Sequence, residues 1–165
     1  MQNLSTPVAQ AGFPTRQVTD MSSGSQGARV LDRDTILKAM ETFPLHQQFG
    51  FTVDASGPGI CSASCVVGDA HLNYGGVVHG GVMYLLLDVT AYCAAMTVAP
   101  EGFNATTHDI HVSVMRPTPP GVTLTLKGTV RKKGRTLFFI DSEASIGDRL
   151  VASARVTKSL VPLSG

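Results

Sequence analysis

The fold of this chain is decided by residues 71–99, which read HLNYGGVVHGGVMYLLLDVTAYCAAMTVA. From Val82 to Ala99 nearly every residue is aliphatic, aromatic or small, and neither Pro nor Gly interrupts the run. This length and composition predict a helix, and a helix that is apolar on all sides is expected to be buried. Its one charge is Asp88, a carboxylate that is costly to bury unless neighbouring groups hold it.

The composition describes an ordinary globular protein of one domain. The 165 residues are 43% hydrophobic and 15% charged, with a formal net charge of +1. A charge so close to zero gives no reason to expect nucleic acid or an acidic partner. The apolar run carries Asp88, Thr90 and Tyr92, so we interpret it as a core helix and expect no membrane partner. No basic segment followed by an apolar block opens the chain, which predicts a cytoplasmic location and free thiols.

The chain divides into a tail and a folded domain. Residues 1–31 are rich in Ser, Gln, Thr and Gly, which predicts a flexible tail, and residues 32–165 form the domain. The domain is expected to begin with a short helix over residues 33–42, which Phe43-Pro44 ends. Two strands, residues 49–53 and 60–67, should follow, joined by a Gly-Pro-Gly turn.

Four more strand patterns follow the long helix. They cover residues 105–116, 122–131, 136–146 and 150–160. The last three are linked by turns so short that they must be antiparallel neighbours. This order predicts an α+β fold in which a curved antiparallel sheet wraps around one long buried helix.

Asp88 is the first candidate for chemistry. Asp is a poor residue for a helix interior, so local preference does not explain its position. It is either functional or a structural carboxylate held by hydroxyls or backbone amides. At the start of the helix, Gly80 and Gly81 would let a substrate approach the backbone closely. The Gly80 N–H could then stabilise an oxyanion, although both glycines could equally serve a tight entry into the helix.

The spacing of these two candidates has a structural consequence. Gly80 and Asp88 are eight residues apart, which is about 12 Å along a helix at about 1.5 Å per residue. One helix therefore cannot easily bring both to the same small group. If they act together, each must come from a different chain, and a homodimer with shared sites follows.

Other polar residues near the helix have a structural and a functional interpretation. Asn73 could donate its amide to the same carbonyl, but a loop Asn is more often a turn residue. His79 could orient the loop or act as an acid, and a hydrogen-bonded structural histidine is the more common role. Thr106 and Thr107, on the next strand, could orient Asp88 or a water molecule.

No metal site or cofactor is indicated. Cys61 and Cys65 lie about 13 Å apart along a strand, too far for one metal or a disulfide. His108 and His111 are expected to point to opposite faces of their strand, which argues against zinc. A run of cations at a predicted hairpin is typical of a solvated turn but could also bind a phosphorylated ligand; these are Arg131, Lys132, Lys133 and Arg135.

The motif Asn73-x5-His79-Gly80-Gly81-x6-Asp88, with the strand order after it, resembles the hotdog-fold acyl-CoA thioesterases. The resemblance covers about residues 45 to 161 and is to the branch that includes the phenylacetate-pathway and 4-hydroxybenzoyl-CoA thioesterases. Some members of this group carry Glu on the helix. Asp at position 88 fits the phenylacetate-pathway type better.

The resemblance implies hydrolysis of an acyl-CoA to a free acid and coenzyme A. By that analogy Gly80 N–H and Asn73 polarise the thioester carbonyl, and Asp88 of the facing subunit is the general base or the nucleophile. His79 supports the loop, and Thr107 matches a hydroxyl that orients the attacking water. The family assembles as homodimers or dimers of dimers. The alternative is a protein that binds acyl-CoA without hydrolysing it.

Overall fold

The computed structural model describes residues 33–163, and the predicted flexible tail over residues 1–31 lies outside this range. The helices are α1 (Arg33–Thr42), α2 (Pro44–Gln48), the single 3-10 turn η1 (Asp69–His71) and α3 (Gly80–Met96). The strands are β1 (Thr52–Gly57), β2 (Ile60–Val66), β3 (Phe103–Val114), β4 (Thr123–Lys133), β5 (Leu137–Ile146) and β6 (Arg149–Pro162).

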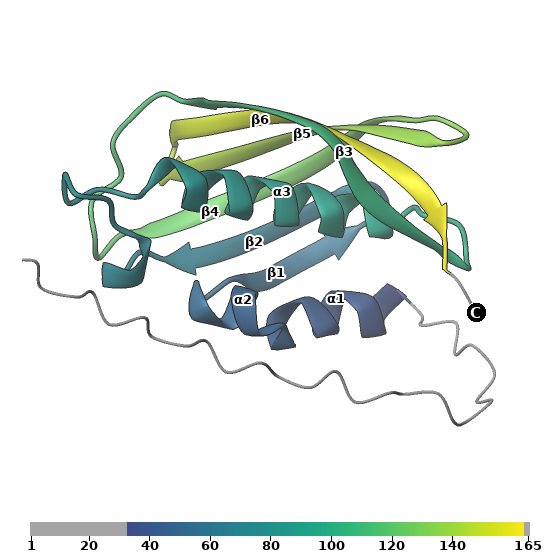
Figure 1. Cartoon of the computed structure of the whole chain (residues 1–165), viewed down its shortest axis with the longest axis horizontal. Coiled ribbons are helices and arrows are strands. Elements are labelled where there is room, and N and C mark those ends of the chain that lie inside the picture. The colour runs from purple at the N-terminus through teal and green to yellow at the C-terminus, as the bar shows by residue number, and fades with distance from the viewer. Residues whose placement is uncertain (1–32, 164–165) are drawn as a thin grey trace, which may run out of the picture.

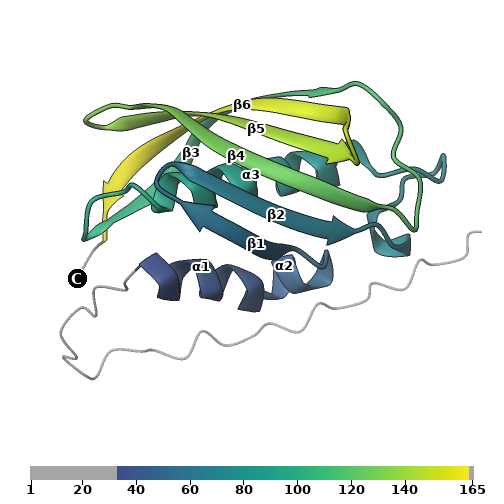
Figure 2. The same cartoon turned by 180° about the vertical axis from the view of Figure 1, so that it is seen from behind.

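The strands form one antiparallel sheet in the order β1-β2-β4-β5-β6-β3. The long helix α3 lies across one face of this sheet, and α1 and α2 lie beside its β1 edge (Figure 1). The opposite face of the sheet is free of helices among the described residues (Figure 2). The α+β architecture predicted from the order of elements is confirmed, as is the antiparallel β4-β5-β6 arrangement.

The core lies between α3 and the inner face of the sheet, which is the face that α3 covers. Fully buried side chains from the helix meet alternate residues of the strands, namely Met83, Leu86 and Leu87 against Leu124, Leu126, Phe138 and Ile140. Gly128 on β4 allows a close approach between the strand and α3. A Cβ atom at this position would lie 2.7 Å from the carbonyl oxygen of Thr90, so only glycine fits without a shift of the backbone.

One face of α3 stays open. Tyr84 is 43% exposed, and Leu85, Asp88 and Tyr92 are half-buried. Burial is therefore complete only on the side toward the sheet. The sequence predicted burial on all sides of the helix because the residues of the open face are themselves largely apolar.

The boundaries of two predicted segments differ in the structure. Pro44 ends α1 as expected, but it also occupies the first turn of α2, a position where its missing N–H costs nothing. Residues 49–51 consequently form the exit from α2, with Gly50 in the left-handed region at φ +57°, and β1 begins only at Thr52. The long helix ends at Met96, three residues before the predicted end.

A bulge in β3 corrects the prediction for two histidines. The pairing of β3 with β6 shifts between Thr107 and Asp109, so His108 is an extra residue that breaks the alternation. The His108 ring contacts Ser159, and His111 pairs with Arg155 on the same face of β6. Both histidines thus face the outer side of the sheet, and the prediction of opposite faces was wrong.

Within residues 33–163, none of the helices is both long and apolar enough to cross a membrane. The same residues contain no cluster of three or more His, Cys, Asp or Glu side chains suited to a metal ion.

Candidate active site

Asp88 projects from the middle of α3 into a hydrogen-bonded cluster with two residues of the sheet. The Lys158 Nζ atom donates to Asp88 Oδ1 at 2.8 Å and to Thr107 Oγ1 at 2.7 Å. Thr107 Oγ1 lies 3.0 Å from both carboxylate oxygens and donates its single hydrogen toward them. The carboxylate is thus held by a cation and a hydroxyl, and its side chain remains 30% exposed.

The register of the sheet positions this cluster. Thr107 on β3 and Lys158 on β6 are direct cross-strand partners, so their side chains project from the same face of the sheet. That face is the inner one, because Val156 and Ala154, which precede Lys158 at alternate positions, are buried in the core. The bulge at His108 follows Thr107 immediately and changes the course of β3 at this point.

Lys158 is the residue that the sequence analysis missed. It is 1% exposed, a rare environment for lysine. Burial lowers the pKa of its ammonium, and the neighbouring Asp88 carboxylate opposes that shift. The ammonium also lies 5.7 Å from the centre of the Tyr92 ring. A signal for it exists in the sequence, because Lys158 stands at an inward position in the alternating pattern of residues 150–160.

A hollow of about 340 Å³ opens beside the cluster. Its polar end consists of Asp88, Thr106, Thr107 and Lys158, and its apolar walls come from Met40, Val89, Tyr92 and Ala105. The side chain of His46 on α2 also lines it. The helices α1 and α2 therefore contribute to the same cavity as the carboxylate.

The start of α3 forms a second polar site. His79 is the N-cap, and its Nδ1 atom accepts a hydrogen bond from the Gly81 N–H at 2.9 Å. The Gly80 N–H has no hydrogen-bond partner within residues 33–163. A donor at this position benefits from the positive end of the helix dipole, which makes it suitable for a developing negative charge.

Asn73 lies near this helix start and stabilises a turn. Its Oδ1 atom accepts from the N–H of Gly75 at 2.8 Å and from that of Val77 at 3.4 Å. These two contacts fix the orientation of the side-chain amide and leave its NH₂ without a partner among the described residues. Asn73 and Gly80 together line a hollow of about 300 Å³, which also contacts Met115 and Arg116 after β3.

The single chain does not bring all predicted site residues together. Asp88 and Thr107 share one hollow, and Asn73 and Gly80 share another. The β4–β5 hairpin with the basic residues lies at the end of the sheet opposite the start of α3 (Figure 1). Its cations diverge: Arg131 forms an ion pair with Asp141 on the outer face at 2.7 Å, whereas Lys133 lies 5.9 Å from the centre of the buried Phe138 ring.

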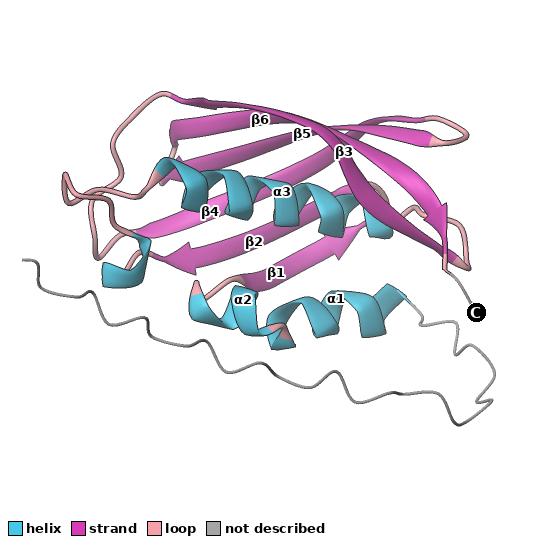
Figure 3. Cartoon of the chain, in the orientation of Figure 1, coloured by secondary structure: helices cyan, strands magenta, loops and turns pink. Residues whose placement is uncertain are grey.

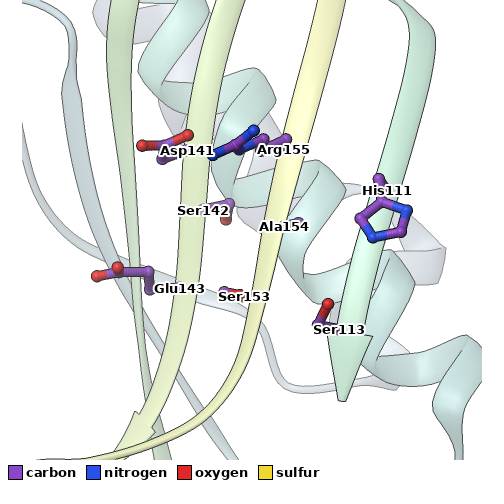
Figure 4. Close-up of a pocket in the computed structure, with 8 residues that line it drawn as sticks. All are labelled: His111, Ser113, Asp141, Ser142, Glu143, Ser153, Ala154 and Arg155. Atoms are coloured by element: carbon purple, nitrogen blue, oxygen red, sulfur yellow. The ribbon is translucent and has the colours of Figure 1, made fainter. Parts of the chain in front are cut away.

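The outer face of the sheet carries a further polar depression of about 410 Å³ (Figure 4). Asp141, Glu143, Arg155 and His111 line it, on the side of the sheet away from α3. None of the residues predicted for catalysis lies there. Asp88 belongs to α3, and this helix lies against the other face of the sheet (Figure 3).

A model of the protein family described as Thioesterase superfamily matches residues 75–153, just under half of the chain. Human acyl-coenzyme A thioesterase 13 is 28% identical over 111 residues, which are 66% of this chain and 79% of that protein. A protein of the archaeon Saccharolobus solfataricus is 28% identical over 92 residues, which are 53% of this chain and 64% of its own length.

Solved structures share the fold. Zebrafish thioesterase superfamily member 2 is 27% identical, with a TM-score of 0.70 over 79% of this chain and 99% of that one. A Streptococcus mutans protein solved with acetyl-CoA bound is 26% identical, with a TM-score of 0.64 over 68% of this chain and 89% of that one. The chain therefore has the hotdog fold, and the match to the Thioesterase superfamily spans the helix that carries both Gly80 and Asp88.

Proposed function

We propose that this protein is an acyl-CoA thioesterase, which hydrolyses a thioester to a free acid and coenzyme A. The observation that carries the proposal is the Asp88 carboxylate. It is held by Thr107 and Lys158 beside a partly apolar hollow, on the same helix whose first turn leaves the Gly80 N–H unpaired within residues 33–163. The spacing of Asn73, His79 and Asp88 also supports a place in the branch of the phenylacetate-pathway and 4-hydroxybenzoyl-CoA thioesterases.

The Gly80 N–H and the free amide of Asn73 would donate to the thioester carbonyl oxygen and stabilise the oxyanion. With Asp88 as general base, the carboxylate takes a proton from water as the water oxygen attacks the carbonyl carbon. The C–S bond then breaks, its electron pair leaves with sulfur, and the proton on Asp88 returns to the thiolate. With Asp88 as nucleophile, the carboxylate displaces the thiolate to form a mixed anhydride, which water hydrolyses.

Three other residues would support the reaction. His79 caps the helix at Gly81 and so holds the Gly80 N–H in position. A larger residue at Gly81 would crowd this cap, since a Cβ atom would lie 3.1 Å from His79 Nδ1 and the imidazole would have to shift. Thr107 accepts from Lys158 and donates to Asp88, which leaves one lone pair for the attacking water.

The site is proposed to be shared between two copies of the chain. Gly80 and Asp88 line separate hollows, and β3 is a twelve-residue edge strand whose residues are mostly exposed. Antiparallel pairing of two β3 edges around residues 110–111 would set Val114 of one copy opposite Thr107 of the other. Because Met115 and Arg116 line the Gly80 hollow, this pairing would join the two half-sites. The exposed edge thus supports a homodimer, and we extend the proposal to a dimer of dimers.

The coenzyme A moiety is proposed to lie with its phosphates near the β4–β5 hairpin. Lys132, Lys133 and Arg135 are exposed there and make no ion pair within residues 33–163. Arg131 would have to release Asp141 to take part. A cytoplasmic location fits the three cysteines, which are all free thiols.

The test is thiol release from a panel of aliphatic and aromatic acyl-CoAs, measured with a thiol-detecting reagent. We expect at least one substrate, and we expect Asp88→Asn to lower kcat on it at least about a hundredfold. Asp148→Asn, in the exposed β5–β6 turn, is the matched control and should keep wild-type activity. Tight acyl-CoA binding without thiol release from any substrate would contradict the proposal in favour of a non-catalytic binding protein.

A further inference from the structure

The two oxygens of the Asp88 carboxylate are not equivalent. Oδ1 accepts from the Lys158 ammonium at 2.8 Å and from the Thr107 hydroxyl at 3.0 Å, whereas Oδ2 has only the Thr107 contact among the described residues. The ammonium is the stronger donor, because it carries a full charge in a largely buried site. Oδ1 is therefore anchored to the sheet, and Oδ2 is the oxygen with capacity for another partner.

Lys158 also determines what the Thr107 hydroxyl can do. The ammonium has hydrogens only to donate, so its 2.7 Å contact makes Thr107 Oγ1 an acceptor. The one hydrogen of Thr107 is then directed to the carboxylate. Without Lys158 the same hydroxyl could rotate and donate elsewhere.

Two of the three hydrogens of the ammonium have acceptors among the described residues. One goes to Asp88 and one to Thr107, and the centre of the Tyr92 ring lies 5.7 Å from Nζ. The side chain is 2% exposed, and Asp88 is its one ion-pair partner within residues 33–163. The ammonium of a lysine enclosed in this way has one fixed position and little contact with solvent.

We propose that Lys158 is a positioning residue that anchors Oδ1 of Asp88 and thereby directs Oδ2 to the substrate. This inference rests on the proposed thioesterase reaction, and it holds whether Oδ2 takes a proton from water or attacks the carbonyl. In either route Lys158 acts through Asp88, and neither route requires it to contact the reacting atoms. Its effect should therefore appear in kcat and not in KM.

The variant Lys158→Met keeps a long apolar side chain and removes the charge. We expect kcat to fall at least about tenfold while KM stays within about twofold. Lys127→Met is the matched control, because Lys127 is an exposed lysine of strand β4 and should keep wild-type kinetics. In the Asp88→Asn background, Lys158→Met should cause no further loss. A kcat within twofold of wild type, or an independent further loss in the Asp88→Asn background, would overturn the proposal.

Chemical rescue distinguishes positioning from a general effect on folding. Lys158→Ala leaves a space for the missing amine, so ethylammonium in the assay should restore part of kcat. Lys158→Met fills that space and should not respond. Rescue of both variants, or of neither, would contradict a role for the ammonium at this position.

A measurement without substrate separates this inference from the proposed function. Asp88→Asn should lower the urea midpoint of unfolding, because it leaves a buried ammonium unpaired, and adding Lys158→Met should raise the midpoint again. If the wild type hydrolyses no thioester but this recovery occurs, the thioesterase proposal fails and the Asp88–Lys158 coupling stands. Additive effects of the two substitutions on the midpoint would show that the contact does not couple them.

Discussion

Cys65 shows how burial of a single side chain affects the pH dependence of stability. Its thiol is 1% exposed, with Sγ 3.0 Å from the carbonyl oxygen of Phe49 and 3.3 Å from Nε2 of His71. Burial raises the pKa of this thiol from 9.0 to about 11. In the unfolded chain the thiol loses its proton near the lower value, and in the folded chain it keeps it until the higher one.

This difference predicts a loss of stability in alkali. Between about pH 9 and 11 the unfolded state binds fewer protons than the folded state, so the free energy of unfolding falls as pH rises. Cys65→Ala removes this contribution and should make the fall shallower. Urea denaturation of both proteins at pH 8 and pH 10.5, with reductant present, measures the change. Parallel curves for the two proteins would show that Cys65 does not contribute.

At the scale of single residues, the sequence singled out Asp88 and its hydroxyl partner Thr107, but not its ion-pair partner Lys158. Asp88 is conspicuous because it is the one charge in an apolar run of residues. Lys158 lies seventy positions away, on a strand that pairs with β3 only in the folded protein. Period-2 alternation marks position 158 as inward, but alternation alone does not say which helix residue meets it.

At the scale of elements, the contact between β4 and α3 depends on Gly128. A Cβ atom there would lie 2.7 Å from the Thr90 carbonyl oxygen and 3.1 Å from the Ala94 Cβ atom. Neither neighbour can move alone, because one is backbone and the other has no rotatable side chain. Gly128→Ala must therefore push the helix away from the sheet.

We expect Gly128→Ala to lower the free energy of unfolding by about 1–3 kcal/mol, as measured by urea denaturation. Gly57→Ala is the control, because the end of β1 has no atom within 4 Å of the added carbon and no left-handed backbone. Its effect should stay within about 0.5 kcal/mol. Equal effects of the two substitutions would show that the close approach at Gly128 does not limit the packing.

The elements that the sequence predicted correctly are those with a strong local signal. The apolar run predicted α3, and the short turns after residue 133 predicted the β4-β5-β6 order. The helix α2 was missed because Pro44 signals the end of one helix and also suits the first turn of the next. The position of β3 at the far edge, beside β6, results from long-range pairing and has no local signal.

At the scale of the whole molecule, the distribution of polar groups along α3 separates the site into two halves. The Gly80 N–H is at the first turn and Asp88 is two turns later, and each lines its own hollow. The sequence predicted this separation, because helical rise alone fixes the distance at about 12 Å. It could not predict the exposed β3 edge that would join two copies.

Two inactive variants test whether the halves belong to different chains. Asp88→Asn impairs one half-site and Asn73→Ala the other, so each homodimer lacks a complete site. A heterodimer of the two variants would contain one site with both lesions and one site with neither. Random mixing in equal amounts makes about half of the dimers heterodimers, so activity should recover to about one quarter of wild type. The measurement is thiol release after joint refolding or co-expression, with each variant alone as its control. If Asn73 and Asp88 of the same chain formed one site, every site in the mixture would still carry one lesion. Mixing would then restore no activity, and the shared-site dimer would be excluded.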